Sequence, residues 1–265
     1  MEFNPNELIL DKVRSVEEYD IATDELVGMT KLAEEPKLST SADDTEITDA
    51  YGSTIADLYR AQKGEFTYTN SLHSLDLAAS QYGTKKEVAT SSNKIIVPVS
   101  ETIQIGSNGE VKLKYVPVGT SGAEVKEVKI VNDNNTYGKT YTVSASPAED
   151  KFTINAASKK ITLPSDVTGR VFVHYERESE QAIKITKRTD SEPEVRKLII
   201  HALFRDPCNK NIVYAGVIVC PRAQIDPTNV ELNLTSDGKH AVAYKLQKPF
   251  CDEDGKLFDI IVTAD

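Results

Sequence analysis

The side chains that could carry acid–base or metal chemistry are few and are not spaced for it. The histidines are His73, His174, His201 and His240. No two of them have the spacing of metal ligands, and no HExxH pattern is present. His174 and His201 alternate with apolar residues in strand-like runs, so we expect both to pack in a core or an interface. His73 is expected on the polar side of a short helix.

Three cysteines, Cys208, Cys220 and Cys251, could supply thiol chemistry. Their odd number and the absence of a CxxC pair argue against a disulfide framework and against a zinc site. We therefore expect buried free thiols. Cys208 and Cys251 occur in similar loop sequences, so these two could be neighbours in space.

Carboxylate and nucleophile motifs are equally weak. The DEDG sequence at 252–255 and the DNN sequence at 133–135 lack the full ligand series of a calcium loop, and turns explain both. The GxSxG, GxGxxG and GxxxxGK[ST] motifs are absent. Without a base beside a nucleophile, no catalytic residue can be named. We expect a protein that is not an enzyme and that holds no metal or cofactor.

The formal net charge of −10 is concentrated at one end of the sequence. Residues 1–50 hold 14 Asp and Glu against 4 Lys and Arg, while the other residues balance at 27 of each sign. Such a surface repels polyphosphate, so binding of nucleic acid through its phosphates is not expected. The charge forms either a solvated face that aids solubility or a surface that must not hold passing DNA.

Runs rich in Val, Ile, Thr and Tyr, with a period near two, predict a mainly β protein. In the middle of the chain they occupy 94–106, 110–119, 124–131, 139–146, 151–164 and 170–178. About seven short strands at this spacing are typical of an immunoglobulin-like sandwich. Longer runs follow at 195–207, 212–225, 240–251 and 257–262. The apolar sequences LIIHALF and GVIVC within them predict strands that are covered on both faces.

Two segments have helical patterns. The first, 72–81, would place Leu72, Leu75, Ala79 and Tyr82 on one face, with Asn70 or Ser71 as its N-cap and Gly83 just past its end. A weaker pattern covers 53–62 through Ile55, Leu58 and Tyr59. Each helix could either cover one end of a sheet or contact another subunit.

The length of 265 residues suggests one or two domains. Polar residues at 90–93 and the charged ERESE sequence at 176–180 are plausible boundaries. We therefore expect a β domain of residues 1–90 and 181–265, split by an inserted β domain of residues 91–180. No apolar run is long enough to span a bilayer, and the N-terminal segment lacks the apolar stretch of a secretory signal. We expect a product that stays in the cytosol.

Two segments carry a resemblance to a known family. They are SADDTEITDAYGSTIADLYRAQKGEFTYTNSLHSLDLAASQYG at 41–83 and the sequence from HALFRDPC to KLFDIIV at 201–262. Their order resembles the tail tube proteins of tailed bacteriophages. The resemblance implies a tail-tube β-sandwich or barrel with one short helix, whose strands join in hexameric rings that stack into a tube. The central module resembles the immunoglobulin-like additions of phage structural proteins and would be displayed outside the tube.

The same resemblance implies a location and partners. The protein would be a structural component of the virion tail, made in the cytoplasm of the host bacterium. Its main partner would be itself, followed by other tail proteins and by a sheath if the tail contracts. Genomic DNA would pass through the tube without specific binding, and no membrane would be involved.

The resemblance also indicates which residues make contacts. The loop 47–62 would reach a neighbouring subunit or ring, and the helix 72–81 would pack along the outer side of the barrel. The candidate contact residues are Ile47, Tyr51, Gly52, Ile55, Leu58, Tyr59, Leu72, Leu75 and Ala79. Asp43, Asp44, Glu46 and Asp49 are candidates for the lumen or for a subunit interface.

Two alternative functions stay open at this level. A capsid decoration or tail-completion protein with an immunoglobulin-like domain would differ from a tube subunit in its copy number per virion. A carbohydrate-binding adhesion module would use aromatic platforms. The absence of Trp argues against such a module, although 11 Tyr keep it possible.

Overall fold

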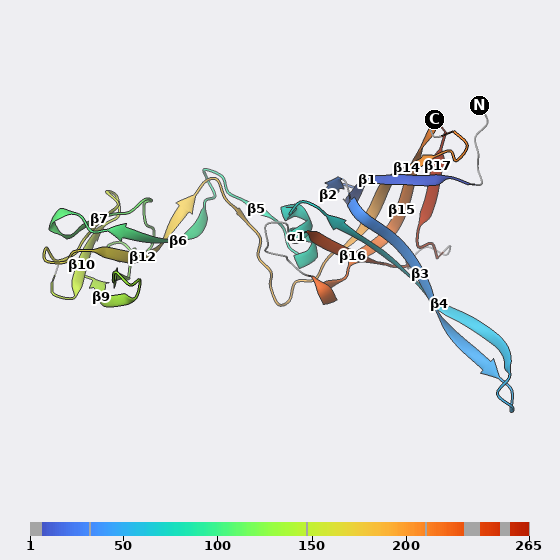
Figure 1. The fold of residues 1–265 in the computed structure, drawn as a ribbon, viewed down its shortest axis with the longest axis horizontal. Coiled ribbons are helices and arrows are strands. Elements are labelled where there is room, and N and C mark those ends of the chain that lie inside the picture. Colours follow the sequence, from blue (N-terminus) through green and yellow to red (C-terminus); the bar gives the residue numbers. More distant parts are fainter. Residues whose placement is uncertain are drawn as a thin grey trace. The chain divides into compact units, whose positions relative to one another are not determined.

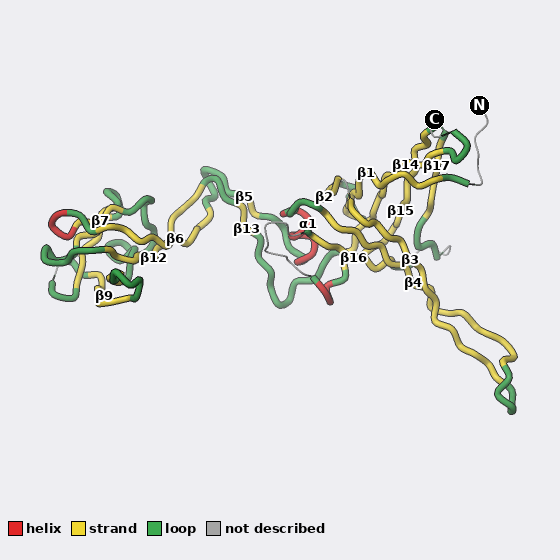
Figure 2. Tube along the Cα trace, viewed as in Figure 1, coloured by secondary structure: helices red, strands yellow, loops and turns green. Residues whose placement is uncertain are grey.

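The chain forms two compact units. The computed structural model describes residues 7–31, 33–146, 148–209, 211–230, 239–249 and 255–264. One unit combines residues 1–86 with 185–265, and the other comprises residues 87–184. We call them the first and the second unit. Both are built mainly of strands, and the described residues contain a single α-helix, which confirms the predicted fold class (Figures 1 and 2).

The first unit is an eight-stranded sheet. Its strands are β1 (Ile9–Asp20), β2 (Leu26–Lys31), β3 (Ala33–Thr48), β4 (Thr54–Asn70), β14 (Val195–Arg205), β15 (Val213–Ile225), β16 (His240–Leu246) and β17 (Asp259–Thr263). The order is β2-β1-β14-β15-β16-β4-β3, and β17 pairs with β15. β15 is long enough to pair with β14 along one side and with both β17 and β16 along the other. A short 3-10 helix, Pro227–Asn229, follows β15.

The sheet curls so that its two ends approach each other. The hydroxyl groups of Thr30 on β2 and Tyr68 on β4 lie 3.1 Å apart, although these strands stand near opposite ends of the order. Tyr244 on β16 donates a hydrogen bond of 2.7 Å to Glu18 on β1. The sheet is therefore a nearly closed barrel. Its concave side holds the core, which includes Val16, Phe66, Tyr68, Leu198, Ile200 and Tyr244.

The helix α1 (Leu75–Tyr82) starts later than the sequence predicts. Ser74, rather than Asn70 or Ser71, is the N-cap, and its side chain accepts a hydrogen bond from the amide of Leu77. Gly83 has the expected left-handed conformation, with φ of 62°. A Cβ at Gly83 would lie 2.0 Å from the carbonyl oxygen of Glu192, so only glycine fits there.

The apolar face predicted for this helix is wrong in most positions. Leu77, Ala78 and Ala79 are buried, and Leu77 joins the core of the barrel. The helix therefore covers part of the core of the first unit, while its place in an assembled barrel stays a prediction. Burial in the core selects this face, whereas the periodic pattern began one turn too early.

The segment 53–62 is not helical. It forms the first part of β4. This strand pairs with β3 along its length, from Ala33 opposite Asn70 to Thr48 opposite Thr54. The helical pattern was misleading because cross-strand pairing outweighs the weak local preference. The acidic stretch before it, expected as a loop, is also a strand. A bulge interrupts the pairing between Ser41 and Asp43, and Ala61 there has a φ of 48°.

The second unit is a seven-stranded sheet around its own core. The order is β6-β12-β8-β9-β10-β11-β7. The strands are β6 (Ile95–Gln104), β7 (Glu110–Lys112), β8 (Glu127–Val131), β9 (Tyr137–Val143), β10 (Lys151–Asn155), β11 (Lys160–Thr162) and β12 (Arg170–Ser179), with a 3-10 turn at Ser107–Gly109. β5 (Glu87–Val88) and β13 (Ile183–Lys184) form a separate pair. The strand predicted over 110–119 is shorter than expected and ends at Lys112.

Candidate functional site

The predicted contact loop is a two-stranded arm. Beyond the bulge, residues 43–48 of β3 pair with residues 54–60 of β4, and neither strand has another partner there. Figure 1 shows this hairpin, which we call the arm, continuing past the body of the first unit. Every residue from 40 to 63 is exposed. A lone hairpin in water is only marginally stable, so the arm resembles an element that is completed by a partner.

One face of the arm is apolar toward the tip, beyond the charged Asp43 and Arg60 at its base. Residues directly opposite each other on paired strands share a face, and the register pairs Thr45 with Leu58 and Ile47 with Ala56. Ile47 and Leu58 are 41% and 37% exposed. Ile55, which precedes Ala56 on β4, lies at a register shift near the tip and is 66% exposed. Nothing in the described chain covers this face.

The other face of the arm is acidic. Asp44 is opposite Tyr59, and Glu46 is opposite Asp57. Like charges in directly opposed positions destabilise a strand pair. Glu46 also hydrogen-bonds the hydroxyl of Thr54. The arm therefore keeps two surfaces of different chemistry back to back.

The tip of the arm is a turn that its own residues hold. Asp49 accepts hydrogen bonds of 2.8 Å from the amides of Tyr51 and Ser53. Gly52 has a φ of 83°, which side chains rarely adopt. Tyr51 projects at the tip and is 95% exposed. Asp49 thus holds the turn, and its role at a lumen or an interface stays a prediction.

The predicted site residues do not form one cluster. The arm brings together all of them from Asp43 to Tyr59. The remaining three lie beyond the other end of β4, which is 17 residues long. Leu72 precedes the helix and is 75% exposed, Leu75 starts it, and Ala79 is buried. Ala79 is therefore not available for a subunit contact.

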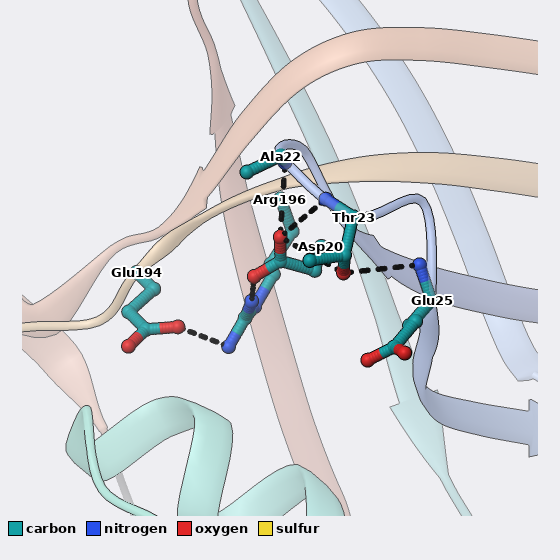
Figure 3. Close-up of polar contacts among 6 residues, drawn as sticks. All are labelled: Asp20, Ala22, Thr23, Glu25, Glu194 and Arg196. Carbon is teal, nitrogen blue, oxygen red and sulfur yellow. Dashed lines mark hydrogen bonds and ion pairs between the residues drawn. The ribbon is translucent and has the colours of Figure 1, made fainter.

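Sequence reasoning missed a polar cluster at the β1–β2 turn (Figure 3). Asp20 accepts bonds from the amides of Ala22 and Thr23, and Arg196 lies 2.8 Å from its other oxygen. These amides, and then Arg196, hold the pKa of Asp20 below its usual value. Arg196 also pairs with Glu194. The cluster joins β14 to the turn and contains no nucleophile, so its role is to fix the turn.

The barrel interior contains two titratable groups that the sequence did not single out. Burial raises the pKa of Glu18, although the Tyr244 hydroxyl opposes this. Burial, and then the nearby His73, lowers the pKa of His240 to about 4. His240 stacks on His73 at 5.0 Å between ring centres and hydrogen-bonds Gln81. These groups are sealed in the core and face no cavity that could take a substrate.

The other candidate chemical residues are placed separately. Cys220 is buried, and burial raises its pKa to about 12, whereas Cys208 is exposed, contrary to expectation. Cys251 and most of the 252–255 motif lie outside the described residues. His174 is exposed and contacts Ser100, so its predicted core position is wrong. Where the structure describes the chain, it contains no cluster of His, Cys, Asp or Glu able to hold a metal.

The comparison with protein families bears on this arrangement. The model of the YomU/Tube protein family matches residues 8–259. The chain belongs to this family. The name of the YomU/Tube family indicates a structural protein of the phage-tube type, and hence a virion component. A search of curated proteins found no match. Among the described residues of this YomU/Tube protein, no helix is long and apolar enough to cross a membrane.

Proposed function

We propose that the protein is the subunit of a phage tail tube and assembles with copies of itself into stacked hexameric rings. The tube would be the conduit through which the genome is ejected. The observation that carries this proposal is the unfinished sheet of the first unit in a chain of the YomU/Tube family. β2 and β3 each have a partner on one side only, within the described residues.

Unpaired edges favour assembly in a ring. A strand at the end of a sheet exposes N–H and C=O groups that pair readily with another chain. A closed ring of identical subunits removes these edges, because each edge pairs with the next copy. In this proposal β2 of one subunit meets the β3 side of its neighbour. The joined sheets of the subunits then form one continuous barrel around the lumen.

The arm supplies the contact between neighbours or between rings. Its residues Ile47, Ile55 and Leu58 are apolar and exposed in the single chain. Exposed apolar residues that gather in one place mark interaction sites. Leu72 and Leu75 are smaller candidates for the same purpose near the start of α1.

The acidic residues of the arm suit a tube that passes DNA. Asp44, Glu46 and Asp57 lie on one face, and like charges repel phosphates at short range. Asp43 is paired with Lys63 at 2.8 Å and contributes less net charge. The proposal places the acidic face toward the lumen or toward a subunit boundary close to it.

The second unit would be an addition to the tube. We infer an inserted domain of residues 91–180 between the two parts of the tube domain, 1–90 and 181–265. The separate core of residues 87–184 supports this division. An immunoglobulin-like character of the insert, and its display outside the tube, belong to the same proposal, as do contacts with other tail proteins and with a sheath.

Electron microscopy of the purified protein tests the proposal. We expect rings or tubes with rotational symmetry, and sedimentation should detect large species. A double variant, Val27→Lys with Met29→Lys, places charges on the edge strand β2 and should reduce assembly, because lysine on an edge opposes strand pairing. A protein that stays monomeric at high concentration would contradict the proposal.

The matched control is Ile96→Lys on β6 in the second unit. Ile96 is 55% exposed, similar to the residues changed on β2. This variant should assemble like the unchanged protein. Equal loss of assembly in both variants would indicate a general effect of added charge rather than pairing at β2.

A further inference from the structure

The second unit contains a cavity of about 780 Å³ on the outer face of its sheet. On β12, Val171 and Val173 are in the core of this unit. Phe172, His174 and Glu176 alternate with them and lie on the opposite, outer face, where they line the cavity. Pockets that bind small ligands usually have volumes of about 300–1,000 Å³, so the cavity has a suitable size for one.

A loop of residues 118–126 forms the other wall of the cavity. It leaves β12 at the bridge between Val118 and Glu176 and returns to the same strand as β8. Val125, near the end of the loop, is fully buried in the core and anchors it. The loop and the outer face of β12 are therefore two fixed walls with space between them.

The walls carry charged groups of both signs that lack partners. Glu127 and Lys129 neutralise each other, with Oε1 and Nζ 3.3 Å apart. Glu124, Glu176 and Lys126 also line the cavity, and none of their charged groups has an ion pair with another described residue. Glu124 is half-buried, and its Oε2 atom is buried without a hydrogen-bond donor in the described chain. An acceptor left in this way is costly, so a ligand that donates to this carboxylate would be stabilised.

His174 and Phe172 add a polar atom and an aromatic ring to the same wall. Nδ1 of His174 lies 2.9 Å from Oγ of Ser100, which orients the imidazole ring and leaves Nε2 for a ligand. Phe172 is half-buried and packs edge-to-face with Tyr137, with ring centres 5.6 Å apart and ring planes at 66°. This packing holds the ring of Phe172 beside the polar groups.

This combination favours a neutral ligand that is rich in hydroxyl groups. A cationic ligand would be repelled by Lys126, and an anionic ligand by Glu124 and Glu176. An apolar ligand would bury the same charged groups without partners. A hydroxyl group both donates and accepts, so neighbouring hydroxyls can bond carboxylates and an ammonium group at once. The C–H face of a sugar ring can also rest on the negative face of an aromatic ring.

We propose that the cavity between the loop 118–126 and β12 binds a neutral saccharide. Glu124 and Glu176 accept hydrogen bonds from its hydroxyl groups, and Phe172 contacts a ring face. The second unit then recognises a glycan, a role beyond the assembly proposed for the chain. The site does not depend on assembly, because every residue that lines it belongs to the second unit. A folded protein that forms no rings should still bind the saccharide.

A glycan array tests the class of ligand. The full-length protein, detected through a terminal tag, is applied to neutral glycans, to glycans that contain uronic acids and to glycans with free amino sugars. We expect neutral glycans to be retained more strongly than both charged groups. Absence of binding to all three groups would overturn the proposal, and so would a preference for either charged group.

Two substitutions test the site, with the neutral glycan that the array retains most strongly as the probe. Glu176→Gln keeps the shape of the side chain and removes its charge, whereas Phe172→Leu keeps an apolar side chain and removes the ring. Each should raise the Kd at least about fivefold, because a charge-assisted hydrogen bond or an aromatic contact is lost. Ligand-observed NMR measures the Kd and tolerates large assemblies. An unchanged Kd in either variant would overturn the proposal.

Glu178→Gln is the matched control. Glu178 lies two residues beyond Glu176 on β12, is exposed and does not line the cavity. Its Kd should stay within about twofold of that of the unchanged protein, because water and salt screen an exposed charge. Circular dichroism should show that all three variants are folded, since their substituted side chains lie outside the core. An equal loss of binding in Glu178→Gln would overturn the assignment of the glycan to this cavity.

Discussion

The two units of this chain treat their apolar side chains differently. Both units bury large apolar side chains completely, such as Phe152 in the second unit and Tyr244 in the first, and they differ in the apolar side chains left exposed. Among the described residues, five large apolar side chains are exposed in the second unit and sixteen in the first. The excess in the first unit is concentrated on β2, on the arm and at the β17 side of the sheet. The second unit leaves few such side chains exposed as a single chain, whereas in the proposed function other copies cover those of the first unit.

The cores differ in a second way. The core of the second unit is built from aliphatic residues with Phe152, Tyr141 and Tyr175. The first unit instead places a carboxyl group, Glu18, next to Tyr244 inside its barrel. A buried carboxyl that keeps its proton is costly to ionise. The stability of the first unit should therefore depend on pH where that of the second does not.

The largest expected effect on assembly comes from removal of the arm. Deletion of residues 43–60, with Asn-Gly as the new turn, should raise the concentration required for assembly by about 100-fold or more, equivalent to ~2.7 kcal/mol. The core should be unaffected because every residue removed is exposed. Sedimentation and electron microscopy measure assembly, and thermal melting checks the fold. If the protein without residues 43–60 forms tubes at the same concentration as the unchanged protein, the exposed arm is not needed for assembly.

A cavity in the second unit should have the opposite pattern. Phe152→Ala should destabilise that unit by about 3–5 kcal/mol, the usual cost of removing a buried Phe. Assembly should continue at temperatures where the unit stays folded. Denaturant titration with probes in each unit measures the two transitions. A matching loss in the first unit would mean that the units do not fold independently.

The next effect concerns acid and the first unit only. The pKa of His240 is about 4 in the folded chain and near 6.5 when unfolded, so the unfolded state binds the proton more readily. Stability is present above pH 6.5 and is lost as the pH falls toward 4, by up to about 3 kcal/mol. His240→Gln should reduce the loss of unfolding free energy of the first unit between pH 6.5 and 4. The stability of the second unit should not change. If the first unit of the variant still loses stability as the pH falls, groups other than His240 cause that loss.

Glu18 should act in the opposite direction. Burial raises its folded pKa above 4.5, so its contribution is complete below that pH and is lost as the pH rises through the folded value. The slope for one group is at most about 1.4 kcal/mol per pH unit. Glu18→Gln keeps an acceptor for Tyr244 and should remove the loss. Unfolding measured from pH 4 to 8 tests this, with the second unit as internal reference.

The smallest effect is expected at the base of the arm. Lys63→Ala breaks the ion pair with Asp43. The side chains of both residues are more than 60% exposed. Such pairs contribute at most about 1 kcal/mol, and usually less. The melting temperature should not change measurably. A clear loss would show that the arm is better ordered in the single chain than its exposure indicates.

Much of the strand content could be predicted because period-two alternation survives in the sequence. The segments 195–207 and 212–225 became β14 and β15 with nearly the expected ends. The first four strands were not predicted. Much of β3 and β4 lies in the exposed arm, where neither face is buried and the alternation of apolar and polar residues is lost.

The candidate site was located more successfully than it was described. The acidic composition and the resemblance pointed to residues 43–59, but not to a hairpin with two unlike faces. The faces depend on register and on a bulge, which are set by pairing between segments and not by local sequence. Leu72 was assigned to the apolar face of a helix because the pattern could not detect that Ser74 is the N-cap.

The bulge at Ala61 shifts the alternation of side chains along β4 by one residue. Before it, Lys63 shares the outer side with Ser41; after it, Arg60 and Leu58 take that side beside Asp43 and Thr45. Regular pairing of the same sequence without the bulge would have placed Tyr59 and Asp57 there instead, and the apolar and acidic rows of β4 would be exchanged. The single extra residue on β4 therefore decides which chemistry each face of the arm carries, and its deletion would keep Arg60 and Leu58 on the outer side.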